Sequence, residues 1–139
     1  MRHRSFGLLA LGFGLLVAAA PVMAHHSFAA EYDSKKPVTL KGIVTKVDWT
    51  NPHVYFYMDV TDESGTIANW ALEMGPPGLL QRAGWNRNLL KVGDEVIVNA
   101  TLAKDNSKQA NARSVTMAAT GKKLGAGSSE TNPPEGNGP

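Results

Sequence analysis

Two neighbouring stretches, 53–61 and 66–74, alternate apolar and polar residues and limit the fold of this chain more than any other feature. Such alternation is typical of β-strands that bury one face. Pairing Val60 with Ala68 brings the two apolar sides together and closes the strands on Asp62 and Thr66. The loop 63–65 then ends at Gly65, where a three-residue hairpin loop needs a left-handed residue. The sequence therefore predicts a β-hairpin with a fixed register.

Similar alternation predicts further strands over 38–49, 95–103 and 109–118, and prolines before Leu79 predict a short helix over 79–83. The strand over 38–49 changes its apolar face near Gly42, with Ile43 among the inward residues, as a bulged and coiled strand would. Three strands, a short helix and two strands follow one another in OB-folds. We therefore expect a mostly β protein, a small five-stranded OB-like barrel with one short helix between strands 3 and 4.

The first 24 residues have the pattern of an export signal. Basic residues at positions 2 and 4 precede an uncharged, largely apolar run that ends in Val22-Met23-Ala24. We expect cleavage before His25, a mature chain that is periplasmic or secreted, and no stable membrane insertion after cleavage. The alternative is an uncleaved membrane anchor, for which the run is barely long enough and is diluted by glycines.

The other end of the chain, residues 125–139, is rich in Gly, Ser and Pro and, proline aside, has no apolar residue larger than alanine. Such a segment buries too little surface to offset its ordering entropy. We expect a disordered tail over 125–139. A single domain then remains over 25–124, with an N-terminal head over 25–37.

Charge and composition exclude several classes of function. The chain has 14 Lys+Arg and 12 Asp+Glu, and loss of Arg2 and Arg4 with the signal would leave the mature chain balanced, so we expect no nucleic-acid partner. The absence of cysteine excludes disulfides, thiolate metal sites and a cysteine nucleophile. Common hydrolase, zinc-protease and phosphate-loop motifs are also missing. We expect a binding or accessory module rather than an enzyme, with copper redox chemistry as the one enzymatic route left open.

Four blocks occur in this order: HHSFAAEYD (25–33), VTLKGIVTKVDWTNPHVYFY (38–57), NWALE (69–73) and NARSVT (111–116). Together they resemble a family of short exported bacterial proteins catalogued as a domain of unknown function. The resemblance implies an exported single domain. It brings no catalytic residue, substrate or cofactor.

The histidines of the mature chain form the first candidate site, for a metal. The candidate ligands are His25, His26 and His53. Cleavage before His25 would free an α-amine that can chelate one ion together with Nδ1 of the same residue, and a further imidazole suits Cu(II). That amine titrates near neutrality, so it is available for ligation. Proteins with a so-called histidine brace bind copper through an N-terminal histidine and a second histidine, and the residues here are similar in type.

The distance along the chain limits this copper hypothesis. His53 follows a long strand, so His25 reaches it only if the head folds back along the barrel. Phe28 and Tyr32 are spaced to dock together on one helix face, which would anchor such a head. The alternative is a more open and weaker site that uses His25 and His26 together with Glu31 or Asp33.

The outward face of the hairpin is the second candidate site, for a small ligand or a periplasmic protein. Besides His53, its polar residues are Tyr55, Tyr57, Asp59, Asn69 and Glu73. OB-folds commonly bind ligands here, and tyrosine rings can stack on them. In the predicted register Asp59 opposes Asn69 and Glu73 opposes Tyr55, so the two carboxylates form no catalytic pair. The alternative is an ordinary amphipathic sheet with exposed tyrosines.

Overall fold

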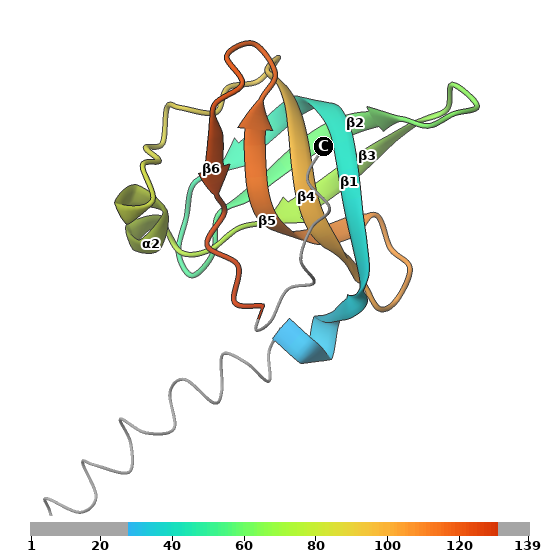
Figure 1. Cartoon of the computed structure of the whole chain (residues 1–139), viewed down its shortest axis with the longest axis horizontal. Helices are drawn as coiled ribbons and strands as arrows, with labels where there is room; N and C mark the ends of the chain where they lie inside the picture. The colour runs from blue at the N-terminus through green and yellow to red at the C-terminus, as the bar shows by residue number, and fades with distance from the viewer. Residues whose placement is uncertain (1–27, 131–139) are drawn as a thin grey trace, which may run out of the picture.

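The computed structural model describes residues 28–130, which fold mostly into β-strands (Figure 1). The strands are β1 (Tyr32–Asp48), β2 (Tyr55–Thr61), β3 (Ile67–Glu73), β4 (Glu95–Ala103), β5 (Gln109–Met117) and β6 (Lys123–Gly125). A helical turn over 28–31 precedes β1, and the short helix α2 (Pro77–Arg82) joins β3 to β4. The predicted mostly β class and the position of the short helix between the third and fourth strands are confirmed.

The strands form a sheet of order β3-β2-β1-β4-β5-β6, in which the neighbours are antiparallel. A parallel pairing of β3 with β5 closes the first five strands into a ring. The sixth strand, β6, pairs with β5 outside this ring and was not predicted. Figure 1 shows the ring, with α2 on one side and the helical turn over 28–31 at the start of β1.

The hairpin of β2 and β3 has the predicted register. Val60 pairs with Ala68, and every other pair along the two strands follows the same register. The Asp62 N–H donates to the Thr66 carbonyl at 2.9 Å, and Gly65 has a positive φ of 84°. Local turn chemistry and alternation therefore suffice to set this part of the fold.

The long first strand bends where β1 changes neighbours. Its buried positions run through Gly42 to Val44, and the register against β2 shifts between Val44 and Lys46. The change of face thus lies at this bulge and not at Gly42, and Ile43, expected to point inward, is 42% exposed. Glycine is needed at position 42 for another reason: a Cβ there would lie 2.5 Å from the Asp59 carbonyl oxygen.

One hydrophobic core fills the ring. Its largest fully buried side chains include Phe56, Met58, Leu72, Leu80, Val96, Val98 and Val115. Each such side chain contributes about 1.5–3 kcal/mol on burial. The core therefore fixes the strands whose other faces carry the polar residues discussed below.

The ordered part of the chain extends beyond the boundary expected at residue 124. Ala126 is fully buried, its N–H donates to the Arg113 carbonyl, and its carbonyl accepts from the Gly75 N–H at 2.8 Å. The side chain of Glu130 is only 1% exposed. Backbone hydrogen bonds and one buried carboxylate here replace the large apolar side chains whose absence suggested disorder.

The expected signal segment 1–24 and the rest of the expected tail, 131–139, lie outside the described residues. Across residues 28–130 the chain forms no helix with the length and apolar character needed to cross a membrane.

Candidate functional site

The polar residues of the hairpin's outward face lie in two separate groups. Tyr55 and Glu73 pair at the end where β2 begins, and Asp59 and Asn69 pair nearer the hairpin loop. Tyr57 lies between them. The predicted oppositions across the hairpin are therefore confirmed, but the face is not one continuous surface.

The carboxylate of Glu73 is the centre of the first group. Its Oε2 accepts hydrogen bonds from the hydroxyls of Tyr55 at 2.5 Å and Tyr32 at 2.9 Å, and its Oε1 accepts one from Nδ2 of Asn111 at 3.2 Å. The Glu73 side chain is only 10% exposed. A buried carboxylate costs several kcal/mol of solvation unless hydrogen bonds replace the water. The three donors supply that replacement.

Strand pairing explains why these groups meet. Antiparallel pairing of β2 with β3 places Tyr55 opposite Glu73, and the parallel pairing of β3 with β5 places Asn111 opposite it from the other side. Tyr32 is the first residue of β1, and its hydroxyl also accepts a hydrogen bond from Nε2 of Gln109 at 2.8 Å. The cluster therefore depends on closure of the ring.

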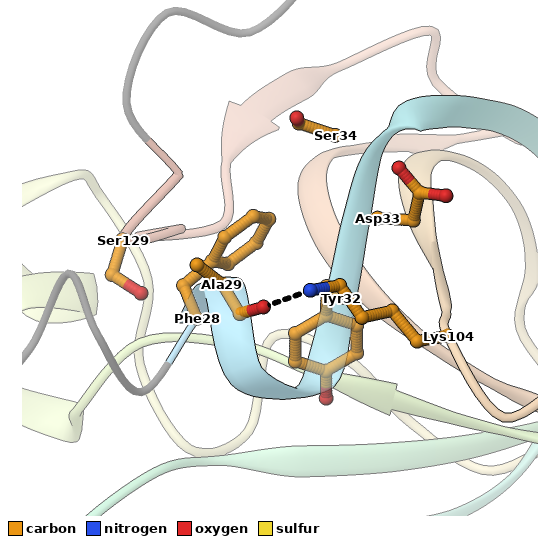
Figure 2. A pocket seen from close by; sticks show the side chains of 7 residues that line it. All are labelled: Phe28, Ala29, Tyr32, Asp33, Ser34, Lys104 and Ser129. Carbon is orange, nitrogen blue, oxygen red and sulfur yellow. Dashed lines mark hydrogen bonds between the residues drawn. The ribbon is translucent and has the colours of Figure 1, made fainter.

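The head of the chain packs over this cluster. The rings of Phe28 and Tyr32 are 5.3 Å apart between centroids, which confirms their predicted docking. The Lys104 N–H donates to the Glu31 carbonyl at 2.9 Å, and Figure 2 shows the Lys104 ammonium reaching the carbonyl of Ala29. The helical turn over 28–31 is thus held against the end of β4.

A cavity of about 230 Å³, which we call the Glu73 recess, lies between the head and the hairpin. Its lining residues are Phe28, Glu31, Tyr32, His53, Tyr55, Glu73 and Ser129. Nδ1 of His53 lies 3.7 Å from Oε1 of Glu73, an ion-pair distance when the imidazole is protonated, and the His53 side chain is 41% exposed. Among these described lining residues there are two carboxylates and no lysine or arginine, so the recess favours a cation.

A second hollow of about 180 Å³ is also lined by Phe28 and Tyr32 (Figure 2). It shares Phe28, Tyr32 and Ser129 with the Glu73 recess and adds the oppositely charged side chains of Asp33 and Lys104. Because the Lys104 ammonium already bonds the Ala29 carbonyl, this hollow has less free charge to offer a ligand.

The two tyrosine hydroxyls of the cluster are held in their protonated form. Burial raises the pKa of Tyr32 well above its ordinary value of 10.0, and the charge of Glu73 raises it further. Burial also raises the pKa of Tyr55, together with the hydrogen bond to Glu73. Both phenols therefore remain hydrogen-bond donors to the carboxylate at neutral pH.

The second group, near the hairpin loop, lines neither the Glu73 recess nor the second hollow. Nδ2 of Asn69 donates to Oδ1 of Asp59 at 2.8 Å and to Oγ1 of Thr45 at 3.1 Å, and both hydrogen bonds lie at the exposed surface. The ammonium of Lys46 lies 5.2 Å from the centroid of the Tyr57 ring, within cation–π range. These residues form a surface polar network rather than a recess.

Of the predicted metal ligands, the structure describes only His53. His25 and His26 lie outside the described residues. Within residues 28–130 no group of three or more His, Asp or Glu side chains could hold a metal ion. Of the alternative donors, Glu31 lines the Glu73 recess and Asp33 lines the second hollow. A metal in this recess therefore requires donors from the segment that precedes Phe28.

The structure links four residues to Glu73, directly or through a neighbour, that were not predicted as site residues: Tyr32, Gln109, Asn111 and Ser128. No local pattern marks them. Asn111 reaches Glu73 through the parallel β3–β5 pairing, which alternation within single strands does not reveal. The one available signal was the spacing of Phe28 and Tyr32, which did predict a docked head.

Fold and site together define a small, mostly β protein with a ring of five strands and a buried carboxylate beside a cation-favouring recess. The chain belongs to a family of unknown function (DUF6152), whose sequence profile matches residues 13–112. This confirms the resemblance found in the sequence. Comparison with curated proteins and with solved structures gave no match. The family contributes no substrate or cofactor, so the function is argued from the residues.

Proposed function

We propose that this protein is an exported binding module that holds one copper ion between its N-terminal histidine and His53, in the Glu73 recess. Signal cleavage before His25 creates the chelating pair, the α-amine and Nδ1 of His25, and His53 supplies a further imidazole. His26 is a supplementary donor. The ring of strands, with its short helix between β3 and β4, supports an OB-like barrel as the scaffold.

The observation that carries this proposal is that Phe28 and His53 line the same recess. His25 precedes Phe28 by three positions, a reach of at most about 11 Å when extended. The docking of Phe28 beside His53 therefore supports the folded-back head that the copper hypothesis requires. In the proposed site this short reach lets His25 bind the same ion as His53.

The environment of His53 also supports a metal ligand. Its Nδ1 faces the Glu73 carboxylate at 3.7 Å, which leaves Nε2 for a metal. Metal-binding histidines commonly direct one ring nitrogen to a carboxylate, which fixes the ring and raises its basicity. The carboxylate in turn is fixed by Tyr32, Tyr55 and Asn111.

Calorimetric titration of Cu(II) into the chain that begins at His25 tests the proposal. We expect binding of one ion with release of protons. A methionine placed before His25 removes the α-amine chelate, and His53→Ala removes the third nitrogen, so each should weaken binding at least about 100-fold. His26→Ala is the matched control and should have a smaller effect. Absence of copper heat, or equal affinity with the added methionine, would refute the proposal.

A metal-free alternative is a small organic ligand in the same recess, and the aromatic rings that line it favour this reading. A ligand bound across Tyr55 and Tyr57, as the hairpin's outward face suggested from the sequence, is less well supported. The Tyr55 hydroxyl is bonded to Glu73, and Lys46 covers the Tyr57 ring. Chemical modification of tyrosine separates the alternatives, because a ligand across the face protects both rings and copper in the recess leaves Tyr57 reactive.

A further inference from the structure

The polar groups around the Glu73 recess have already used most of their capacity for hydrogen bonds. An ionised carboxylate can accept about four hydrogen bonds. Glu73 accepts three from protein groups, and its Oε1 also lies 3.7 Å from Nδ1 of His53. The hydroxyl of Tyr55 donates to Glu73, and the hydroxyl of Tyr32 both donates to Glu73 and accepts from Gln109. A ligand rich in N–H or O–H donors therefore finds few free acceptors on this wall.

The recess still offers negative charge. Glu31 lines it and is exposed, and its side chain makes no hydrogen bond or ion pair with another of residues 28–130. Together with Glu73 it gives the recess two carboxylates, so even a protonated His53 leaves an excess of negative charge. The recess therefore attracts a cation through charge, without requiring new hydrogen bonds.

Aromatic rings form much of the remaining lining. The rings of Phe28, Tyr32 and Tyr55 all line the recess, and the first two lie 5.3 Å apart between centroids. Aromatic rings attract cations, and rings grouped around a site are the common way in which proteins bind quaternary ammonium groups. The volume of about 230 Å³ lies below the roughly 300 Å³ at which pockets for drug-sized molecules begin, so the ligand is small.

Within residues 28–130 no group of three or more His, Asp or Glu side chains could hold a metal ion. A cation bound by these residues alone is therefore one that needs no coordinating ligands. We propose that the Glu73 recess binds a small quaternary ammonium ion through its two carboxylates and its aromatic rings. This inference goes beyond the proposed function and uses no residue before Phe28. Since copper requires donors from that earlier segment, each proposal can fail without the other.

A free solute fits the recess better than the head group of a membrane lipid. The exposed large apolar side chains among residues 28–130 are Ile43, Ile67, Leu79 and Val92, and none of them lines the recess. Proteins that lie on a membrane bury exposed apolar side chains at the lipid boundary. The surroundings of the recess lack such an anchor.

Three small probes separate charge from shape. They are choline, the uncharged alcohol in which a tert-butyl group replaces the trimethylammonium group, and ethanolamine, whose ammonium has N–H donors in place of the methyl groups. Each is titrated, with a chelator present, into the chain that begins at His25 and followed by backbone amide signals in ¹⁵N NMR. We expect choline to bind in the millimolar range or tighter, with shifts at Glu31 and Tyr55. The other two probes should bind about tenfold more weakly.

Glu31→Gln removes the unpaired carboxylate without disturbing the hydrogen bonds of Glu73. The affinity for choline should fall about threefold, the size expected for one exposed charge. Glu63→Gln is the matched control, because Glu63 is also exposed and makes no side-chain hydrogen bond or ion pair with another of residues 28–130, but it lies in the hairpin loop. This control should leave the affinity unchanged.

Absence of choline binding, or equal affinity for the uncharged alcohol, would overturn recognition of a cation. Equal affinity for ethanolamine would overturn the preference for a quaternary ion. Equal losses in Glu31→Gln and Glu63→Gln, or shifts confined to residues away from the recess, would overturn the site. Sedimentation of the protein with phosphatidylcholine vesicles would overturn the assignment to a free solute. A chain that binds choline but no copper would refute the proposed function and leave this inference intact.

Discussion

The two ends of one hairpin face behave differently although their sequences look alike. Each end has a carboxylate on one strand opposite a hydrogen-bonding side chain on the other, Glu73 with Tyr55 and Asp59 with Asn69. At the Glu73 end the head and residues near Ser129 cover the face and leave a recess. At the Asp59 end the same kind of pair stays exposed.

This comparison shows that the candidate site comes from what covers the strands rather than from the strand residues themselves. Because Glu73 is buried, a donor or carboxylate there that loses its partner cannot bind water instead. The hydrogen bonds of Glu73 are therefore necessary for the stability of the folded state. At the exposed end, water replaces any lost partner. Equivalent substitutions at the two ends should therefore have very different effects.

The largest expected difference is between Glu73→Ala and Asp59→Ala. Removal of Glu73 leaves the hydroxyls of Tyr32 and Tyr55 and the Asn111 amide without their acceptor, so we expect a loss of about 3 kcal/mol or more in the free energy of unfolding. Asp59→Ala should cost less than about 0.5 kcal/mol. Urea unfolding of both variants measures this difference, and equal losses would break the comparison.

A second prediction concerns alkaline pH. Since burial raises the pKa of Tyr55 and of Tyr32 above the unfolded value, the folded state keeps protons that the unfolded state releases. Stability should therefore be fully present below about pH 10 and fall above it, by up to about 1.4 kcal/mol per pH unit for each proton retained.

Phenylalanine variants measured across this pH range sharpen the comparison. Tyr55→Phe should flatten the fall by removing one of the retained protons, while Tyr57→Phe, two residues along the same face, should keep the slope of the unsubstituted protein. Thermal unfolding from pH 8 to 11 is the measurement. A slope that is unchanged in Tyr55→Phe would contradict the buried state of its hydroxyl.

The smallest expected effect is that of Asn69→Ala. It removes the hydrogen bonds to Asp59 and Thr45, but both bonds lie at the exposed surface, so the change in unfolding free energy should stay within about 0.5 kcal/mol. Copper affinity should not change. A loss above 1.5 kcal/mol on urea unfolding, the order expected for a buried network, would show that the two ends are alike after all.

The sequence predicted best what depends on neighbours in the chain. The hairpin register followed from alternation and from Gly65, and the docking of Phe28 on Tyr32 followed from helical spacing. The change of face in β1 was predicted near Gly42, but it occurs at the bulge between Val44 and Lys46. Glycine is present at position 42 because the strand approaches β2 closely there.

What the sequence could not predict depends on ring closure. The contact of Asn111 with Glu73 needs the parallel β3–β5 pairing, and no periodicity within a strand specifies that partner. The order of residues 126–130 depends on backbone hydrogen bonds and on the buried side chain of Glu130, which composition does not reveal. The two ends of the described residues, near Phe28 and near Ser129, thus line the recess together, and the sequence predicted only the part near Phe28.

The most direct test of the account is the intact mass and metal content of the protein exported by cells and purified without chelators. We predict a chain that begins at His25 and carries one copper ion. A different first residue would remove the chelating α-amine from the site. A chain that begins at His25 but retains no copper after Cu(II) is added would contradict the proposed function directly.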